Sequence, residues 1–296
     1  MSAHVDPWAQ NGLMPAAQAR LGQRWNGPVV VETVIVAHHE RVVFTTRGPD
    51  GRLVVVKADT DTARLSREYD AMAAASRAGL PVPDVVDHVH CGGPALLVTG
   101  HVPGGALDDT GCGAGWRHAA GLLRRLHDHA DPPATLSIPG NGSDWWALFR
   151  WWVDHEVDTC KGRGLVGREV LSRLRPCLLE AFTGQQPPPL VMLHGDCRPE
   201  HWLIRSGTVT AVIDFGDACL GDPVWELAVM TAWHPARLPA LLDGYQPSGA
   251  VRQRLNRLWT PYRMMRQLAA VAWMHDHGQD PTTTVTGLAH QAARLP

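Results

Sequence analysis

The sequence predicts an α+β fold of two lobes, a small β-rich lobe followed by a larger helical lobe. Residues 29–99 carry short apolar, β-branched runs separated by turn signals, whereas residues 106–296 show mainly helical periodicity. The glycine-rich residues 100–105 separate the two patterns and are the expected hinge, which leaves residues 1–99 as the first lobe. The 296 residues are enough to bury a core in each lobe.

The first lobe is expected to contain an antiparallel meander, one main helix and two more strands. Gly48-Pro49-Asp50-Gly51 is a strong turn signal between two strands, and Gly79 with Pro81 ends the helix. A further short helix is expected near Ala16–Leu21. The elements in order are strands at Val29–Val36, Val42–Thr46 and Leu53–Lys57, a helix at Thr62–Ala78, and strands at Val82–Val89 and Ala95–Thr99.

The second lobe is expected to be helical around one β-hairpin. Asp144 is a typical N-cap for a helix, and the tail from Gly278 is expected to fray. The predicted helices are Trp116–His129, Trp145–Asp158, Arg168–Phe182, Pro223–Ala232, Pro235–Leu242 and Val251–His277.

The hairpin brings polar residues together. Trp202–Arg205 and Thr208–Ile213 are joined by a Ser-Gly turn, so Arg205 should face Thr208 and His201 should face Val212. This register would set Asp214 within a residue or two of His201, at the edge where Asp196 lies. Two carboxylates and a polar ligand at one edge are the layout needed to hold a metal-bound phosphate beside a base.

Composition excludes several classes of protein. The 27 basic and 29 acidic residues are nearly balanced and form no basic stripe, so nucleic acid is not an expected partner. No apolar run reaches the ~18 residues of a membrane span, and residues 1–15 lack the apolar core of a signal peptide, so a cytoplasmic protein is expected. The six cysteines are scattered without a Cys-x-x-Cys pair, which argues against zinc and disulfides.

Lysine is rare in this chain. Of the 27 basic residues only Lys57 and Lys161 are lysines. A lysine kept where Arg is otherwise preferred suggests a role for a compact point charge. Lys57 ends the strand Leu53–Val56, whereas Lys161 is interpreted as a surface residue.

An ordered set of motifs resembles the aminoglycoside phosphotransferase and choline-kinase-like family. A single motif of this kind is weak, but the set covers roughly residues 30–245 and is specific. In chain order the motifs are Val54–Lys57, Arg67–Tyr69, Leu80–Pro83, Leu97–Gly104, Leu126-His127, His194-Gly195-Asp196 followed by His201, and Ile213–Asp217 followed by Gly221-Asp222-Pro223.

The resemblance implies a two-lobed protein-kinase-like fold whose first lobe binds a nucleotide. Asp196 is then the candidate base for the acceptor hydroxyl, and Asp214 a candidate Mg²⁺ ligand. Lys57, paired with Glu68, would hold the α- and β-phosphates. The backbone of Gly100 and Val102 would face the purine. Side chains do not distinguish adenine from guanine, so ATP is the default and GTP remains open.

Two features depart from the family pattern. His201 replaces the usual Asn, and imidazole is a poorer Mg²⁺ ligand than an amide oxygen. A His at this position also resembles the macrolide kinases of the same superfamily, and the alternative is that His201 only hydrogen-bonds the loop. The stretch Ala37–Arg41 has no glycine, although backbone amides of residues 38–41 are candidates for covering the phosphates; an exposed hairpin tip is the alternative.

The segment Asp144–Asp158 is the predicted specificity element. Trp145, Leu148, Phe149 and Trp152 share a helix face that must be core or pocket wall. Asp154 and Asp158 form a like-charge pair that a cationic ligand would relieve, although Arg150, four residues before Asp154, would do the same on a solvated face. Further candidates for an acidic cleft are Glu200, Asp108, Asp109 and Glu226.

These observations together predict an ATP- and Mg²⁺-dependent O-phosphotransferase. Its expected acceptor is a cationic small-molecule antibiotic, an aminoglycoside or a basic peptide, and its role is resistance or self-protection. It is expected to be a monomer or weak dimer. The alternatives are a kinase of a macrolide or of a metabolite such as choline, and a catalytically silent nucleotide-binding module.

Overall fold

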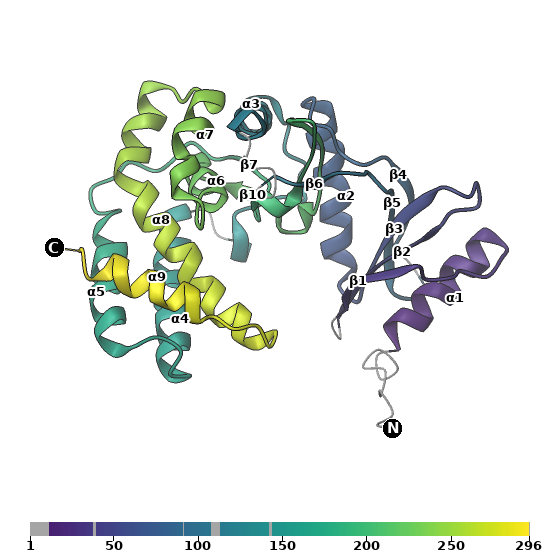
Figure 1. Cartoon of the computed structure of the whole chain (residues 1–296), viewed down its shortest axis with the longest axis horizontal. Coiled ribbons are helices and arrows are strands. Elements are labelled where there is room, and N and C mark those ends of the chain that lie inside the picture. Colours follow the sequence, from purple (N-terminus) through teal and green to yellow (C-terminus); the bar gives the residue numbers. More distant parts are fainter. Residues whose placement is uncertain (1–11, 38–39, 91, 108–112, 142–143, 296) are drawn as a thin grey trace.

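A computed structural model describes residues 12–37, 40–90, 92–107, 113–141 and 144–295 of the chain. A β-rich part and a helical part lie side by side, and the helix α2 stands between them (Figure 1). The predicted α+β architecture is therefore confirmed. No helix in these ranges has both the length and the apolar character needed to span a bilayer.

The β-rich part is built on a five-stranded antiparallel sheet of order β1-β2-β3-β5-β4. The predicted meander and the two later strands are all present. Its strands are β1 (Thr33–Ala37), β2 (Arg41–Arg47), β3 (Leu53–Asp59), β4 (Val85–Val89) and β5 (Ala95–Gly100), and its helices are α1 (Leu13–Trp25) and α2 (Thr62–Arg77).

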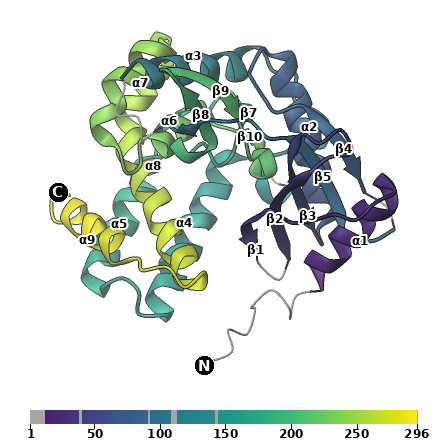
Figure 2. The ribbon, with the colours of Figure 1, turned by 45° about the vertical axis from the view of Figure 1, so that its right-hand side comes forward.

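The two helices cover opposite faces of this sheet, because side chains alternate along each strand. On β5, Leu96 packs with Leu21 of α1, whereas Leu97 belongs to the cluster that contains Leu65 of α2. Seen after a 45° turn, α1 lies on the outer side of the sheet (Figure 2). The α2 side faces the helical part and carries Lys57 of β3 toward it.

The helical part surrounds two small β-ladders. Its helices are α3 (Gly113–His129), α4 (Trp145–Gly162), α5 (Arg168–Glu180), α6 (Pro223–Met230), α7 (Leu238–Tyr245), α8 (Gly249–Asp276) and α9 (Thr282–Ala292). Its strands are β6 (Gly105–Ala106), β7 (Val191–Leu193), β8 (Trp202–Arg205), β9 (Thr208–Val212) and β10 (Cys219–Gly221). Short 3-10 turns lie at Pro139–Asn141, Pro199–His201, Phe215–Asp217 and Pro235–Arg237.

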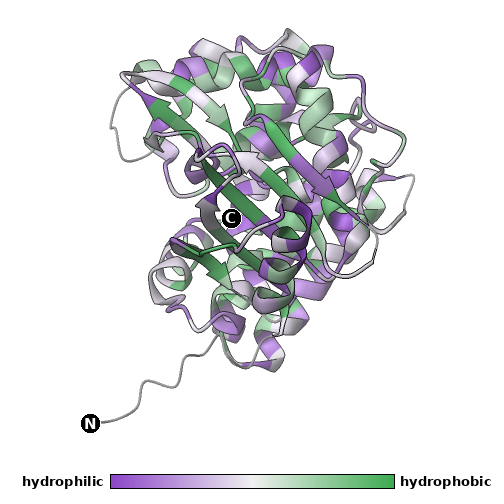
Figure 3. Ribbon diagram, turned by 90° about the vertical axis from the view of Figure 1, so that its right-hand side faces the viewer, coloured by the Kyte–Doolittle hydropathy of each residue, from purple (hydrophilic) through white to green (hydrophobic). Residues whose placement is uncertain are grey.

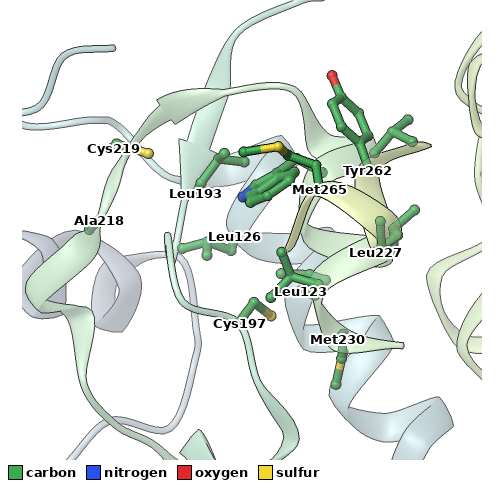
Figure 4. Close-up of a cluster of buried hydrophobic side chains, with 14 of the residues drawn as sticks. Leu123, Leu126, Leu193, Cys197, Ala218, Cys219, Leu227, Met230, Tyr262 and Met265 are labelled. Carbon is green, nitrogen blue, oxygen red and sulfur yellow. The ribbon is translucent and has the colours of Figure 1, made fainter. Parts of the chain in front are cut away.

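The main core lies under the β7–β8 loop. Coloured by hydropathy, the strands are largely hydrophobic, whereas helices alternate between hydrophobic and hydrophilic residues (Figure 3). The core brings together side chains from α3, β7, α6 and α8 around Cys197, which is fully buried (Figure 4). This packing fixes one end of the loop that contains Asp196.

Two details differ from the sequence predictions. The tail does not simply fray, since Thr282–Ala292 forms α9 against α8. The hairpin pairs Arg205 with Thr208 as expected, but a bulge at Thr210 shifts the register and sets Trp202, not His201, opposite Val212. The extra residue makes His201 the neighbour of Ile213, whose N–H donates to the His201 carbonyl at 3.0 Å.

The helix-capping prediction for α4 is confirmed. The Asp144 side chain accepts a hydrogen bond from the Trp146 N–H at 2.9 Å. Trp145 and Phe149 are buried, so the aromatic face of α4 is mainly core. Cys160, Cys197 and Cys219 are free, buried thiols. A fourth free thiol, Cys177, is half-buried, and Cys91 and Cys112 lie outside the described residues.

Candidate active site

The loop after β7 makes a turn that only glycine tolerates. Gly195 has φ +88°, and a Cβ at this position would lie 1.8 Å from the carbonyl oxygen of Asp217. The close approach brings the Asp196 loop against the segment after Asp214. The sequence places these two acidic residues 18 positions apart, and this backbone contact joins their segments in space.

The buried carboxylate of Glu226 holds the loop that contains Asp196 in place. Glu226 of α6 is fully buried and accepts the N–H of His194 at 3.0 Å and that of Gly195 at 2.9 Å. His127 Nε2 lies 3.1 Å from Glu226, and its Nδ1 lies 2.7 Å from the Tyr245 hydroxyl. The expectation that Glu226 lines an acidic cleft is therefore wrong, because its carboxylate is buried and accepts hydrogen bonds from two backbone amides.

Asp196 itself is held by two guanidinium groups. Arg198 Nε lies 3.1 and 2.9 Å from its two carboxylate oxygens, and Arg266 Nη2 lies 3.0 Å from Oδ1. Burial by itself would raise the pKa of Asp196, but nearby charges, led by Arg266, outweigh it and hold the pKa below its ordinary value. Asp196 is therefore an ionised acceptor at neutral pH.

The first lobe supplies the lysine that the sequence singled out. Lys57 Nζ lies 2.5 Å from Glu68 Oε1, so the predicted ion pair is present, and 2.7 Å from Asp214 Oδ1. Lys57 lies on β3, Glu68 on α2, and Asp214 follows β9. Three elements thus converge on one ammonium group, as a site for a phosphate chain requires.

The alkaline titration of Lys57 tests this arrangement. Burial alone would lower the Lys57 pKa, but Asp214 and Glu68 outweigh it and raise the pKa above 10.5. Because the folded-state pKa is raised, the stabilisation is complete below the unfolded-state pKa and is lost as pH rises through the folded-state value. Nitrogen-15 NMR of the two lysine side chains should show Lys57 titrating above 10.5, with exposed Lys161 as reference. A Lys57 midpoint below this value would contradict the arrangement.

Arg41 is a second cation that the sequence did not single out. Its Nε lies 2.9 Å from Asp59, and its Nη1 lies 4.0 Å from Asp214 Oδ1. Nη2 is buried and finds no hydrogen-bond partner within the described part of the chain. Arg41 starts β2, so it stands at the end of the stretch 38–41 that is expected to cover the phosphates.

The backbone at Asp214 is strained. Its φ of 66° and ψ of 58° lie in the left-handed region, which few residues other than glycine adopt. The conformation turns the chain sharply at the end of β9 and directs the carboxylate toward Lys57. Lys57 is the main reason that the Asp214 pKa lies well below its usual range, so Asp214 is ionised.

His201 presents a lone pair to Asp214. Its Nδ1 lies 2.8 Å from the Asp196 carbonyl oxygen, which can only accept, so Nδ1 carries the proton. Nε2 then has the lone pair, 3.3 Å from Arg198 Nη2 and 3.5 Å from Asp214 Oδ2. Burial lowers the His201 pKa, which keeps the ring neutral.

This donor pair fits a divalent cation. A lone pair that faces an ionised carboxylate oxygen is stabilised by a positive charge between them. The described residues contain no group of three or more His, Cys, Asp or Glu side chains arranged to hold a metal. Two protein ligands suit Mg²⁺, which usually takes one or two carboxylates and completes its shell with phosphate oxygens and water.

The two hinge candidates differ in their surroundings. The Gly100 N–H donates to the Asp84 carbonyl at 2.8 Å, so this donor is used inside the sheet. The next residue, His101, donates its N–H to Leu53. Val102 lies beyond the end of β5 and is half-buried. The Gly100 N–H is therefore already bonded within the protein, and it stays a prediction that backbone groups of Gly100 and Val102 face the purine.

The predicted substrate carboxylates are either paired with an arginine or exposed. Asp154 is paired with Arg175 of α5 at 2.8 Å, and Arg150 pairs instead with Asp144. In the solvated-face alternative, the counter-charge of Asp154 therefore comes from Arg175 and not from Arg150. Asp158, one turn further along α4, and Glu200, in the 3-10 turn before β8, are exposed.

Glu156 is the α4 carboxylate that interacts with Arg266, and sequence reasoning missed it. It lies ~200° around the helix from Asp154, so the two side chains point in nearly opposite directions. Trp152 donates its indole N–H to Glu156 at 3.0 Å and packs its ring against Trp225. The available signal was the four-residue spacing of Trp152 and Glu156 on one helix face.

Some candidates fall outside the described residues. These are His38 and His39 of the glycine-free segment, and Asp108 and Asp109 of the expected acidic cleft.

Comparisons with known proteins agree with the motifs. A family model described as a phosphotransferase enzyme family matches residues 34–265. Streptomycin 3''-kinase of Streptomyces griseus is 31% identical over 192 residues, which cover 58% of this chain. The match spans 66% of that relative's own length, just under two thirds.

Solved structures share the fold. A thermostable mutant of aminoglycoside phosphotransferase APH(4)-Ia, in ternary complex with ADP and hygromycin B, has a TM-score of 0.72 at 16% identity. The similarity covers 94% of this chain and 98% of that one. Macrolide 2'-phosphotransferase MphH from Brachybacterium faecium has a TM-score of 0.62 at 17% identity over 96% and 98% of the two chains.

The predicted two-lobed kinase-like fold is thus confirmed. The family match extends from β1 into α8 and includes both carboxylate segments of the site. The chain belongs to the phosphotransferase enzyme family.

Proposed function

We propose that this protein transfers the γ-phosphoryl group of ATP to a hydroxyl group of a small-molecule antibiotic. The observation that carries the proposal is the convergence of Lys57, Glu68 and Asp214 beside the loop of Asp196. Phosphoryl transfer needs little covalent chemistry from a protein beyond positioning and charge stabilisation. A cation, an ionised metal ligand and a separate carboxylate are the groups that such catalysis uses.

In the proposed reaction the acceptor oxygen attacks the γ-phosphorus in line. Asp196 orients the hydroxyl and takes its proton, the bond from the γ-phosphorus to the bridging oxygen breaks, and ADP leaves. Lys57, held by Glu68, would contact the α- and β-phosphates, and Arg41 offers a second donor. The backbone of Val102 would contact the purine. ATP suits a cytoplasmic location, and GTP is to be tested beside it.

Asp214 and His201 would hold the divalent cation. When bound, the cation neutralises phosphate charge. Asp214 contributes a hard oxygen and His201 a softer nitrogen, so the pair should accept Mn²⁺ more readily than two oxygen ligands would.

Exchanging His201 for Asn should change the metal preference. In His201→Asn the amide oxygen is the harder ligand, so the Mg²⁺ concentration for half-maximal activity is expected to fall relative to that for Mn²⁺. The measurement is initial rate against each metal at fixed nucleotide. His201→Ala serves as the control that removes the ligand without replacing it. An unchanged Mg²⁺ to Mn²⁺ ratio in His201→Asn would show that His201 does not ligate the metal.

A cationic acceptor is the first class to test. One relative of this chain is streptomycin 3''-kinase, and one structure of similar fold is a complex with hygromycin B. We propose Trp152 and Glu200 as acceptor contacts. The assignments of Asp154 and Asp158 remain predictions, since Asp154 already has Arg175 as its counter-ion.

A macrolide is the second candidate acceptor. The observation that favours it is His201, since a His at this position resembles the macrolide kinases and a macrolide 2'-phosphotransferase shares the fold. An acceptor panel separates the classes: aminoglycosides, basic peptide antibiotics, macrolides and choline, each with ATP or GTP and Mg²⁺. Mass spectrometry should find a phosphorylated product in one class. Nucleotide binding without any phosphorylated product would support the silent binding module instead.

A further inference from the structure

The carboxylate of Asp196 is capped by two cations. Both Asp196 and Arg266 side chains are 18% exposed, so their contact is shielded from solvent. Oδ1 receives Arg266 Nη2 at 3.0 Å and Arg198 Nε at 3.1 Å. Oδ2 receives Arg198 Nε at 2.9 Å. Each carboxylate oxygen therefore already accepts a charged donor.

The two arginines have different origins. Arg198 belongs to the Asp196 loop and reaches His201, so it is part of the metal-side framework. Arg266 comes from α8, 70 residues away along the chain. Its neighbours on α8 are fixed, because Arg263 and Gln267 donate to carbonyls of the segment after α6. Arg266 thus extends from a rigid helix onto the base.

The guanidinium of Arg266 also has two other interaction partners, Trp233 and Glu156. Its guanidinium lies 5.6 Å from the ring centre of Trp233, a distance at which a cation is attracted to an aromatic face. Glu156 of α4 interacts electrostatically with Arg266 and is half-buried. A shift of the guanidinium toward Trp233 and Glu156 would remove one of the two donors from Oδ1 and leave only Arg198 on the carboxylate, without leaving the Arg266 cation unpaired.

A capped carboxylate is a poor base. A general base must lie within hydrogen-bond reach of the proton that it takes, with an oxygen lone pair free to accept it. Water is always available as a competing acceptor. If water attacks the γ-phosphorus, a new P–O bond forms, the bond to the bridging oxygen breaks, and a water proton passes to Asp196. The products are ADP and phosphate, and the nucleotide is wasted.

We propose that Arg266 is a latch that suppresses nucleotide hydrolysis by capping Asp196, and that the acceptor displaces it toward Glu156 and Trp233. This inference rests on the proposed phosphotransferase function. A positively charged group on the acceptor displaces Arg266 by like-charge repulsion, and the acceptor hydroxyl then takes the vacated place beside Asp196. The latch therefore couples release of the base to the arrival of the proper acceptor.

The test is Arg266→Met, which keeps the length of the side chain and removes its charge. Acceptor-independent ATP hydrolysis should rise roughly tenfold, the kinetic equivalent of losing one charge-assisted hydrogen bond. The ratio of hydrolysis to transfer should rise with it, and Arg266→Lys should restore part of the suppression. Arg252→Met is the matched control, an exposed arginine about 21 Å nearer the start of α8. It should leave hydrolysis unchanged.

Glu156→Gln tests the proposed displaced position of Arg266 beside Glu156 and Trp233. It should raise the KM for the acceptor without raising hydrolysis, because the latch stays closed. Arg266→Met should bind ATP and melt at the same temperature as the wild type. If this variant nevertheless hydrolyses ATP at a rate equal to or below that of the wild type, the proposal that Arg266 is a latch is wrong. An unchanged acceptor KM in Glu156→Gln would remove the proposed displaced position. Failure of the phosphotransferase function would look different, since the wild type would then phosphorylate no acceptor while the hydrolysis comparison could still be made.

Discussion

Replacing Asp196 by Asn is expected to reduce phosphoryl transfer by a factor on the order of 10²–10⁴, the range for loss of a general base. The amide has nearly the same shape but cannot take the acceptor proton. Because Asp196 does not contact Lys57 or Asp214, nucleotide affinity should stay close to that of the wild type. The measurement is kcat for transfer beside the Kd for ATP.

The control for this variant is Asp243→Asn. Asp243 is exposed on α7 and pairs with Arg117, so the same chemical change there should leave kcat unaltered. Full transfer activity in Asp196→Asn would remove the base from the mechanism. A parallel loss of ATP affinity would instead assign Asp196 to nucleotide binding.

Replacing Glu226 by Ala is expected to destabilise the protein by about 2–6 kcal/mol, because two buried amide groups lose their acceptor and each unsatisfied group costs roughly 1–3 kcal/mol. His194 and Gly195 carry those amides, so the loop of Asp196 should also lose its position and kcat should fall. Such a cost is large against the 5–15 kcal/mol that typical domains have in total. Urea denaturation and kcat measure the two effects.

Two variants bracket this prediction. Glu226→Gln keeps one acceptor oxygen and should retain part of the stability. Glu169→Ala removes an exposed carboxylate whose partner Arg173 lies 3.5 Å away, and such surface pairs contribute 0–1 kcal/mol. If Glu226→Ala unfolds at the same urea concentration as the wild type, the buried carboxylate does not support the loop.

The sequence predicted those parts of the site that depend on local spacing. Lys57 and Glu68 are joined by one turn and the start of a helix, so their pairing followed from the strand and helix assignments. Asp196, His201 and Asp214 are held near one another by one hairpin, and a single bulge did not separate them. Apolar β-branched runs and turn signals likewise predicted the five strands and the antiparallel pairing of the first three, whereas the structure supplied the pairing of β5 with β3 and β4.

Residues that enter the site from distant elements were not predictable. Arg266 meets Asp196 only because α8 crosses the end of the loop, and one side chain in a 28-residue helix carries no local signal of that contact. Arg41 was hidden because its neighbours Asp59 and Asp214 belong to other elements. Glu226 looked like a cleft residue, since acidity alone does not reveal burial against backbone amides.

The substrate side shows the same limit. Four-residue spacing correctly grouped the α4 aromatics, but it did not say which face of the helix meets α5. Asp154 pairs with Arg175 of α5, whereas Glu156 accepts the indole N–H of Trp152. The charges around Asp196 are therefore more cationic than the composition of α4 suggested, and an incoming acceptor must compete with two arginines for the same carboxylate.

The most direct test of the central claim follows the γ-phosphate itself. ATP labelled with oxygen-18 in its γ-phosphoryl group is incubated with wild type or Asp196→Asn, Mg²⁺ and each antibiotic of the panel, and the products are read by mass spectrometry. The account predicts that the wild type moves the labelled phosphoryl group onto one hydroxyl of the accepted antibiotic and that Asp196→Asn does so far more slowly. Label that appears only in free phosphate with every acceptor, or equal transfer by both proteins, would contradict it.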